Sequence, residues 1–360
     1  MKTYTTDPTH ITRIISNKGD PNEILIKEFG TTFKAYRDKW NRAEQCILVQ
    51  EYPLHLDFEL TFACNLRCKM CVNTIPPHER GYKTEPSKSI SFDTFREIID
   101  EGVSQGLSAI TLNGNNEPLL KEDLVRYIGY ARESGVLDIM LHSNGLALTK
   151  EKSKELLEAG LTKIFFSLDA INKSTYEKIR IGGDFDQVMV NINYFLQLKK
   201  EMKKTLPITR VSFVENKLNS SEFDQFIDYW KDKIDFFTIQ SFCNTRMGRS
   251  NYQELEEMFR LPAHKYVPHT ICAQPYQRLF IRNNGEVLPC CHWFSMEHPV
   301  GSIYENSIKD IWMGEKMRRF RSGVNAKLER QPEVCRRCRK SSLPQNYPYE
   351  WKPEPLQEAM

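Results

Sequence analysis

Short apolar runs and longer amphipathic runs alternate through the middle of the chain. The apolar runs are rich in β-branched and aromatic residues and predict strands, which lie at 55–62, 107–112, 137–142, 163–168, 207–214 and 235–240. The amphipathic runs place apolar residues three and four positions apart and predict helices, which lie at 92–106, 121–135, 150–160, 185–204 and 221–233. Six β/α units in series predict an α/β fold whose parallel strands are joined by right-handed crossovers.

Polar residues follow each predicted strand. The carboxyl ends of parallel strands share one edge of a sheet, where such folds bind their ligands. In strand order, the segments at this edge are a loop with three cysteines, Gly114–Pro118, Ser143–Gly145, Asp169, Glu215–Asn216 and Cys243–Asn244. Together they predict one ligand site along this rim.

Composition narrows the classes of protein that fit. The 360 residues can hold one large domain and a smaller one, and the net charge of +3 is too small to indicate nucleic acid or an acidic membrane as partner. No apolar run is long enough to cross a bilayer, and the first twenty residues lack the apolar core of a signal peptide. We therefore expect a cytoplasmic protein, in which ten cysteines favour metal ligands, reactive thiols or buried side chains over disulfides.

The loop after the first predicted strand reads FACNLRCKMC and holds Cys64, Cys68 and Cys71. A disulfide framework needs an even number of cysteines, and a tetrahedral zinc site normally takes four ligands. Three thiolates instead suit a 4Fe-4S cluster whose fourth iron stays open for a small molecule.

This Cys-x-x-x-Cys-x-x-Cys loop resembles the signature of radical S-adenosylmethionine (SAM) enzymes. The resemblance implies a partial (β/α)6 barrel over roughly 51–245, in which Cys64, Cys68 and Cys71 hold the cluster and its open iron chelates SAM. It further implies that an electron from the cluster cleaves SAM, and that the resulting 5′-deoxyadenosyl radical abstracts hydrogen from a substrate.

The same resemblance implies a set of contacts to SAM. GNNEPLL resembles the family's GGEP segment, with Asn115 and Asn116 in place of the glycine pair and Glu117 matching. An arginine that pairs with the SAM carboxylate corresponds to Arg180, although a surface helix charge is the alternative, and Met70 would lie beside adenine or pack in the core. The full expected set is Met70, Asn116, Glu117, Ser143, Asn144, Ser167, Asp169 and Arg180.

A second cysteine set lies in the C-terminal third. RLFIRNNGEVLPC predicts two strands around an Asn-Asn-Gly turn, which can bring Cys272 and Cys290 to the later Cys335/Cys338 pair. Four thiolates suit either structural zinc or a fully ligated 4Fe-4S cluster, and their spacing does not choose between the two.

The order of residues in this region resembles the SPASM/twitch extension of radical SAM enzymes. The small number of cysteines resembles the shorter twitch form, as in the aminocyclitol dehydrogenase of butirosin biosynthesis. That resemblance implies one auxiliary 4Fe-4S cluster on Cys272, Cys290, Cys335 and Cys338, with Cys291 as a neighbour. The domains expected are an N-terminal extension (1–50), the barrel (51–245), the twitch domain (246–345) and a tail (346–360).

The segment 314–340 carries ten Lys or Arg residues and three Glu. Such a segment is usually a solvated face, but it can also offset the charge of a cluster, dock an acidic reductant such as flavodoxin or ferredoxin, or hold a substrate phosphate. No interleaved aromatic platform accompanies the charges, which disfavours nucleic acid as a partner.

Several functions remain open. In a dehydrogenase of a sugar or aminocyclitol derivative, either free or nucleotide-linked, the auxiliary cluster takes an electron from the substrate radical. In a radical epimerase, Cys243 returns a hydrogen atom to that radical with no net oxidation. A peptide-modifying maturase and a non-catalytic metal-binding scaffold are further alternatives. The prediction taken forward is a radical SAM oxidoreductase that oxidises a small sugar or aminocyclitol derivative.

Overall fold

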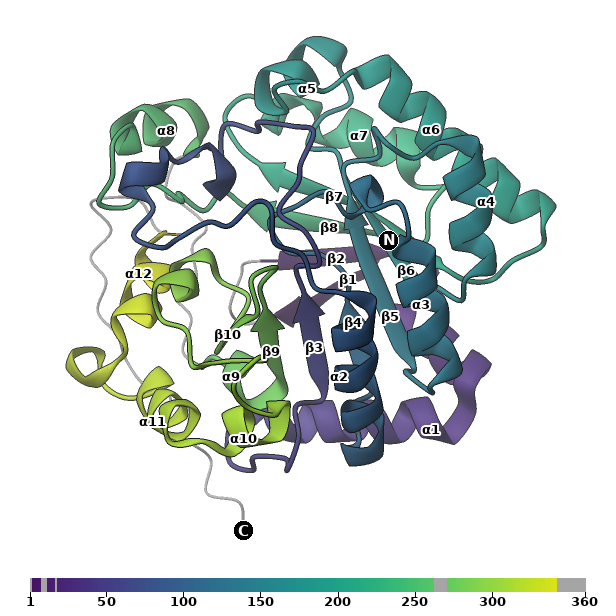
Figure 1. Cartoon of the computed structure of the whole chain (residues 1–360). Coiled ribbons are helices and arrows are strands. Elements are labelled where there is room, and N and C mark those ends of the chain that lie inside the picture. Colours follow the sequence, from purple (N-terminus) through teal and green to yellow (C-terminus); the bar gives the residue numbers. More distant parts are fainter. Residues whose placement is uncertain (1, 8–11, 17, 262–270, 342–360) are drawn as a thin grey trace.

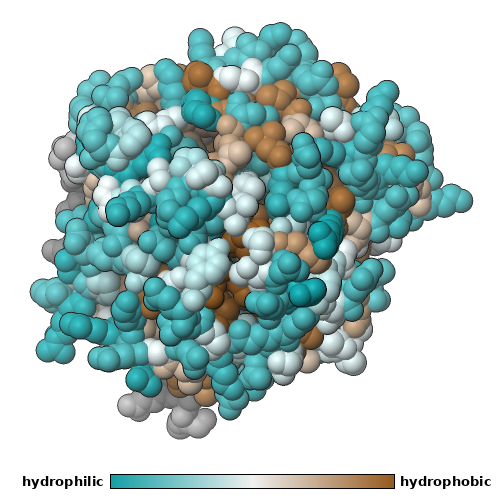
Figure 2. Space-filling model, in the orientation of Figure 1, coloured by the Kyte–Doolittle hydropathy of each residue, from teal (hydrophilic) through white to brown (hydrophobic). Residues whose placement is uncertain are grey.

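The computed structural model describes residues 2–7, 12–16, 18–261 and 271–341. The expected tail at 346–360 lies outside these residues. No helix within them is long and apolar enough to span a bilayer. The face seen in Figure 2 is largely hydrophilic, and hydrophobic side chains reach the surface there in small groups.

One mixed sheet of eleven strands organises the molecule (Figure 1). Its order is β1-β2-β8-β7-β6-β5-β4-β3-β9-β10-β11. The strands are β1 (Lys2–Asp7), β2 (Thr12–Ser16), β3 (His55–Phe58), β4 (Ala109–Thr111), β5 (Asp138–Ser143), β6 (Lys163–Ser167), β7 (Ile208–Glu215), β8 (Phe236–Ser241), β9 (Arg278–Ile281), β10 (Glu286–Leu288) and β11 (Gly301–Ser302). Strands β3 to β8 pair in parallel and in chain order, which confirms the expected partial (β/α)6 barrel.

Helices cover the outer side of these strands, and α2 illustrates why they form. Ser91 accepts a hydrogen bond from the backbone N–H of Thr94, and Gly106, with φ of 98°, ends the helix in the left-handed region. The helices are α1 (Pro21–Glu44), α2 (Phe92–Gln105), α3 (Leu124–Glu133), α4 (Lys150–Glu158), α5 (Lys173–Ile179), α6 (Phe185–Glu201), α7 (Phe223–Trp230), α8 (Tyr252–Phe259), α9 (Gln274–Gln277), α10 (Ile308–Met313), α11 (Glu315–Val324) and α12 (Glu333–Ser341). Short 3-10 turns are η1 (Val72–Thr74), η2 (Pro77–Glu79), η3 (Pro118–Leu120), η4 (Ser220–Glu222), η5 (Trp293–Glu297) and η6 (Leu328–Arg330).

The two faces of the barrel strands differ in chemistry. Outward residues such as Leu56, Ile139 and Phe213 belong to the main hydrophobic core beneath the helices. Inward residues of the same strands, among them Asp57 and His142, are largely polar and line a cavity. Alternation along a strand makes this division possible, because successive side chains point to opposite faces.

The N-terminal extension, for which the sequence indicated no role, is part of the barrel. Strand β2 pairs antiparallel with β8, and α1 crosses beneath the sheet (Figure 1). Phe33, Tyr36 and Trp40 of α1 form a second apolar cluster with Phe165 and Phe236 from the barrel strands. Helix α1 therefore closes the amino-terminal end of the barrel.

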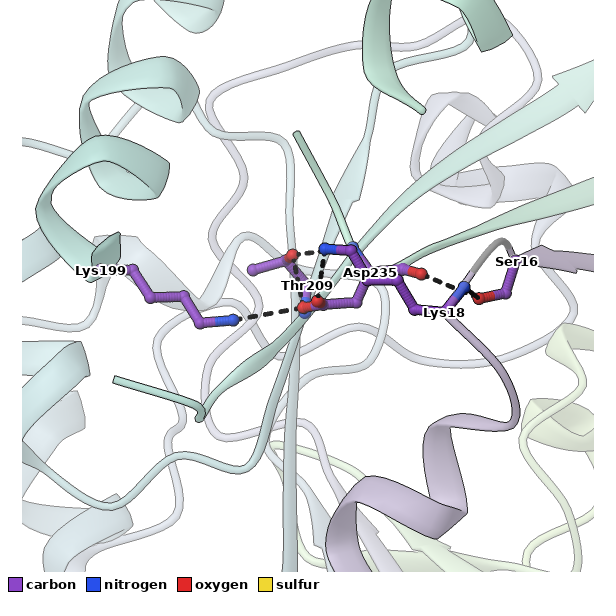
Figure 3. A network of polar contacts seen from close by, with 5 residues as sticks. All are labelled: Ser16, Lys18, Lys199, Thr209 and Asp235. Carbon is purple, nitrogen blue, oxygen red and sulfur yellow. Dashed lines mark hydrogen bonds and ion pairs between the residues drawn. The ribbon is translucent and has the colours of Figure 1, made fainter. Parts of the chain in front are cut away.

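A polar network around Asp235 ties this extension to β7 and α6 (Figure 3). The Asp235 carboxylate accepts hydrogen bonds from Lys18 Nζ at 3.1 Å, Lys199 Nζ at 3.2 Å and the Thr209 N–H at 2.7 Å, while Ser16 Oγ donates to the Asp235 carbonyl at 3.1 Å. Burial acts to raise the pKa of Asp235, but Lys199, Thr209 and Lys18 outweigh it and hold that pKa below its ordinary value. The carboxylate is thus ionised and fully partnered.

The C-terminal elements continue the sheet beyond β3. Strand β9 pairs in parallel with β3, and β10 returns antiparallel beside β9, which confirms the expected hairpin. Helices α10 to α12 gather on this side of the molecule (Figure 1).

We predict that Asp235→Asn lowers the free energy of unfolding by about 2–3 kcal/mol at neutral pH, because Lys18 and Lys199 lose their charged acceptor. The pKa of Asp235 is lower in the folded protein than in the unfolded chain. The contribution of its carboxylate to stability is therefore complete above the unfolded pKa and is lost as the pH falls through the folded pKa. The difference from the unsubstituted chain should therefore shrink below about pH 4. Melting temperatures at pH 7 and in acid measure this.

The control is Asp228→Asn, which removes an exposed ion pair with Lys231 at 2.8 Å. It should leave the melting temperature nearly unchanged, because exposed pairs contribute little. Equal melting temperatures for Asp235→Asn and the unsubstituted chain would contradict the stabilising role of this network.

Candidate functional site

The three-cysteine loop follows β3 and is held in place by neighbouring segments. Its backbone N–H groups at Arg67 and Lys69 donate to the carbonyls of Ile181 and Ile179, at 2.8 and 3.2 Å. At its end, Cys71 begins the turn η1 and accepts a hydrogen bond from the Asn73 N–H at 3.5 Å. The loop is therefore fixed against the segment that follows α5.

The thiols of Cys64, Cys68 and Cys71 are half-buried and near enough to influence one another electrostatically. Burial raises the pKa of Cys71 to about 12, and burial also raises the pKa of Cys64. Protonated thiols release their protons when they bind a metal. Three converging thiols can hold a cluster with one open position.

Glu117 joins the loops after three strands. Its carboxylate accepts from Ser143 Oγ at 2.8 Å and from the backbone N–H groups of Asn144 and Leu119 at 2.7 and 3.1 Å. Asn144 in turn donates to Asn65 in the three-cysteine loop at 2.8 Å. Burial raises the pKa of Glu117 above its ordinary value, while these hydrogen bonds act against the rise.

Asp169 and Arg180 form a sequestered ion pair beside the cysteines. Arg180 Nη2 lies 2.5 Å from Asp169 Oδ2, and Nη1 lies 3.8 Å from Cys68 Sγ. Burial acts to lower the pKa of Arg180, but Asp169 and Cys68 outweigh it and raise that pKa above its ordinary value. Arg180 Nε is buried and has no hydrogen-bond partner within the described part of the chain. The guanidinium therefore keeps one free donor at this site.

The other expected contact residues lie around this centre. Asn116 is bound within its own loop, where its Oδ1 accepts from the Gly114 N–H at 2.9 Å and its Nδ2 donates to Thr61 at 3.3 Å. Met70 packs against an apolar cluster that includes Phe242 and Phe259. Ser167 ends β6. The structure thus brings these residues to one edge of the barrel.

The second cysteine set surrounds an apolar hollow, here called the auxiliary site. Cys272, Cys290, Cys335 and Cys338 line it, together with apolar side chains of α11 and α12. Burial raises the pKa of Cys335 to about 12 and raises the pKa values of Cys290 and Cys338 as well. Four thiols around an apolar hollow can hold an iron–sulfur cluster.

The four thiols that line this hollow could hold either a structural zinc or an iron–sulfur cluster, since both bind thiolates.

Cys243 and Cys291 occupy different places from each other. Cys243 follows β8 and adds to the effect of burial in raising the pKa of Cys338. Cys243 is not among the residues that line the barrel cavity. Cys291, next to Cys290, lines both the barrel cavity and the auxiliary site, and its Sγ lies 3.8 Å from Gln274 Oε1.

The barrel cavity has a volume of about 390 Å³ and is lined by inward residues of the strands and by Trp40 of α1. This volume suits a small ligand. His142 lines it, and burial together with Arg210 lowers the pKa of His142 to about 3, so that its imidazole is neutral. An adjoining hollow of about 540 Å³ on the α1 side shares Arg210 and Phe165 with it.

Sequence reasoning missed these cavity residues. His142, Arg210 and Gln240 lie inside predicted strands, where only the strand ends were expected to be functional. The available signal was alternation, since each polar residue is next to an outward apolar residue of the hydrophobic core, namely Leu141, Val211 or Ile239.

The fold and the two cysteine sites define a class of iron–sulfur protein in which a parallel α/β barrel carries a three-cysteine loop. A radical SAM superfamily model matches residues 58–228, and a SPASM model, described as an iron-sulfur cluster-binding domain, matches residues 272–339. The chain therefore carries a radical SAM domain followed by a C-terminal SPASM domain. The first domain implies a SAM-binding 4Fe-4S cluster, and the second implies auxiliary iron–sulfur clusters.

Known proteins resemble this chain in part. "Probable GTP 3′,8-cyclase" of Methanococcus maripaludis is 31% identical over 170 residues, which are 47% of this chain and 52% of that protein. The chain thus spans about half the length of such curated relatives. SuiB of Streptococcus suis, solved with its precursor peptide SuiA, is 14% identical with a TM-score of 0.59, covering 82% of this chain and 71% of SuiB. BtrN, solved with AdoMet and 2-DOIA, is 17% identical with a TM-score of 0.49, covering 80% of this chain and 93% of BtrN. At 14% identity the likeness to SuiB concerns the fold.

The basic segment 314–340 divides into buried and exposed parts. Arg321 and Arg339 are buried, and Arg339 and Arg336 act to lower the pKa of Cys335 against the effect of burial. Lys316, Arg318 and Arg319 are exposed on α11.

We predict that Asp169→Asn lowers the free energy of unfolding by about 3 kcal/mol, because it leaves Arg180 as a sequestered charge without its carboxylate. Asparagine tolerates the positive φ of 65° at this position and can still accept from the Val214 N–H, so the loss reports on the ion pair. The melting temperature of the reconstituted protein measures the change.

The matched control is Asp186→Asn, which breaks an ion pair of the same 2.5 Å length between Lys173 and Asp186 on the exposed surface. This variant should melt close to the unsubstituted chain. If the two variants melt at the same temperature, burial of the Asp169–Arg180 pair has no energetic consequence.

Proposed function

We propose that this enzyme uses SAM to oxidise a small polar molecule, a sugar or aminocyclitol derivative, held in the barrel cavity. The observation that carries the proposal is that Gln274 and Cys291 line both this cavity and the auxiliary site. An electron acceptor at the auxiliary site would therefore adjoin the substrate. When bound, the first cluster supplies the electron that cleaves SAM, and the radical so formed removes a hydrogen atom from the substrate.

The residues of the first site take specific roles in this proposal. Cys64, Cys68 and Cys71 hold the SAM-binding cluster, and Arg180 offers its unpartnered Nε to the SAM carboxylate. Glu117 fixes the loops that carry Ser143 and Asn144. The remaining contacts to SAM come from Met70, Asn116, Ser167 and Asp169.

Cys272, Cys290, Cys335 and Cys338 hold a second 4Fe-4S cluster. The apolar hollow that they line and the match to a SPASM model, described as an iron-sulfur cluster-binding domain, support a cluster over zinc. Removal of a hydrogen atom leaves a substrate radical, and its oxidation requires the loss of one electron and one proton. A cluster held by these cysteines would supply the acceptor for the electron, and water would take the proton.

An acidic reductant, flavodoxin or ferredoxin, supplies the electron for SAM cleavage. The exposed charges of Lys316, Arg318 and Arg319 on α11 support docking of such a partner, because complementary charge steers association.

The names of the similar proteins suggest two other classes of substrate, GTP and a peptide. GTP belongs among the compounds to assay, because the matched proteins are named GTP 3′,8-cyclases. A peptide substrate is less supported. The described part of the N-terminal extension pairs with the sheet and closes the amino-terminal end of the barrel, so it does not form a separate peptide-binding module.

We predict that the anaerobically reconstituted chain holds about eight iron atoms and forms one 5′-deoxyadenosine for each substrate molecule that loses two electrons. Combined Cys335→Ala and Cys338→Ala substitution should reduce the iron to about four per chain and abolish oxidised product, while SAM cleavage continues. Iron, sulfide, zinc, 5′-deoxyadenosine and product are measured in the same samples.

Cys46→Ala is the matched control, because Cys46 is a half-buried thiol outside both sets whose Sγ lies 3.5 Å from the Cys272 carbonyl. It should keep all the iron. SAM cleavage that survives combined replacement of Cys64, Cys68 and Cys71 by alanine would falsify the assignment of the first site. Zinc in place of the second four irons would exclude the oxidation.

A second candidate function is radical epimerisation, in which a thiol returns a hydrogen atom to the substrate radical. Cys291 favours it, because this thiol lines the cavity and lies outside the proposed ligand sets. Cys243 was the donor expected from sequence, and its position beside Cys338 gives it less support.

For this second function we predict that Cys291→Ser abolishes turnover while 5′-deoxyadenosine still forms, and that Cys243→Ser turns over normally. In deuterated water the product of the unsubstituted enzyme should gain one deuterium from the exchanged thiol. Loss of turnover in Cys243→Ser alone reverses the assignment of the donor, and product without deuterium rules out thiol return.

A further inference from the structure

We infer that the α1 side of the barrel cavity binds an oxyanion of the substrate, a phosphate ester or a carboxylate, with Arg210 as its counterion. This inference rests on the proposed function, because it assumes that the substrate occupies the barrel cavity. It narrows the substrate class from polar molecules in general to anionic ones.

Arg210 points into the barrel from the third position of β7. In register it stands beside Phe165 of β6 and Phe236 of β8, and its guanidinium carbon lies 3.5 and 5.8 Å from the centres of their rings. It lines both the 390 Å³ cavity and the adjoining 540 Å³ hollow. The aromatic rings orient the guanidinium and stabilise its charge in part, without neutralising it.

The other cations that line these hollows include two that are paired with carboxylates. Arg278 Nη1 lies 3.4 Å from Asp57 Oδ2, and Lys163 Nζ lies 2.5 Å from Asp138 Oδ2. Within the described residues, Arg210 has no ion pair, and its Nε is buried without a hydrogen-bond partner. Burial lowers the pKa of Arg210 to about 9, with no carboxylate acting against it. The guanidinium is still charged at neutral pH.

A second unpartnered group stands on the neighbouring strand. Thr238 of β8 is 2% exposed and lines the same cavity, and its hydroxyl has no hydrogen-bond partner among the described residues. His142 Nδ1 lies 3.5 Å from Arg210 Nη2 and accepts from it, so the neutral imidazole carries its proton on Nε2. Donors from two adjacent strands, Arg210 and Thr238, thus line the same cavity.

An oxyanion satisfies this arrangement better than a neutral or cationic group. Buried polar groups in proteins are nearly always partnered, and a sequestered charge without a counterion is costly. A guanidinium binds phosphate or carboxylate through parallel N–H donors, and the Thr238 hydroxyl can add a third. An ammonium group of the substrate would be repelled at the same place.

The test uses the reconstituted enzyme with SAM and measures binding of inorganic phosphate and of acetate by calorimetry. We expect binding of one of these probes, with preference for phosphate indicating a phosphate ester and preference for acetate a carboxylate. Arg210→Met keeps an apolar stem between the two rings but removes the charge, and should weaken binding at least about tenfold. The affinity of Arg210→Lys for the probe should lie between those of Arg210→Met and the unsubstituted chain, because lysine keeps the charge but lacks the parallel N–H donors of a guanidinium.

The matched control is Arg126→Met, since Arg126 stacks at 3.7 Å on Phe92 on the outer surface, away from the cavity. It should bind the probes as the unsubstituted chain does. Equal affinity in Arg210→Met, or no binding of either probe, overturns the inference. Arg210 would then be solvated by water and would not pair with an anion of the substrate. A different result would contradict the proposed function, namely an unsubstituted chain that forms no 5′-deoxyadenosine.

Discussion

The parallel pairing of β9 with β3 is the contact on which the arrangement of the two cysteine sites depends. His55 to Phe58 align with Arg278 to Ile281, so the SPASM domain continues the barrel sheet. Inside the barrel, Asp57 links the two strands through Arg278 of β9, at 3.4 Å, and it also contacts His55 of its own strand at 3.2 Å. Burial acts to raise the pKa of Asp57, but Arg278 and His55 outweigh it and lower that pKa to about 2. The carboxylate therefore stays ionised and holds both strands.

This pairing explains why the barrel cavity adjoins the auxiliary site. The three-cysteine loop extends from the carboxyl end of β3, while α9 and its neighbouring Cys272 precede the amino end of β9. Strands that are paired in register cannot shift relative to each other without turning their inward side chains outward. The pairing thus fixes the wall of the cavity that Gln274 and Cys291 share with the auxiliary site.

The strand and helix order and the cysteine spacing could be predicted from sequence because they are local properties. The β-branched runs became β3 to β8, and the Asn-Asn-Gly turn became the β9–β10 hairpin. The role of the N-terminal extension could not be predicted, because α1 is kinked at Gly30 and its partners lie in β6 and β8. The placement of Cys291 is likewise not local, because the elements that bring this thiol to both the barrel cavity and the auxiliary site are distant in sequence.

The polar interior sets this barrel apart from one filled with apolar side chains. Barrels of this type are usually packed with layers of Val, Ile and Leu. Here the inward positions include the polar residues Thr111, His142 and Gln240. The hydrophobic stabilisation therefore comes from the outer face of the sheet and from the cluster between α1 and the barrel strands. Removing apolar packing from the centre leaves space for a ligand, and the helix at the amino end compensates by closing the barrel. The N-terminal extension is therefore part of what makes an open, polar cavity compatible with a stable fold.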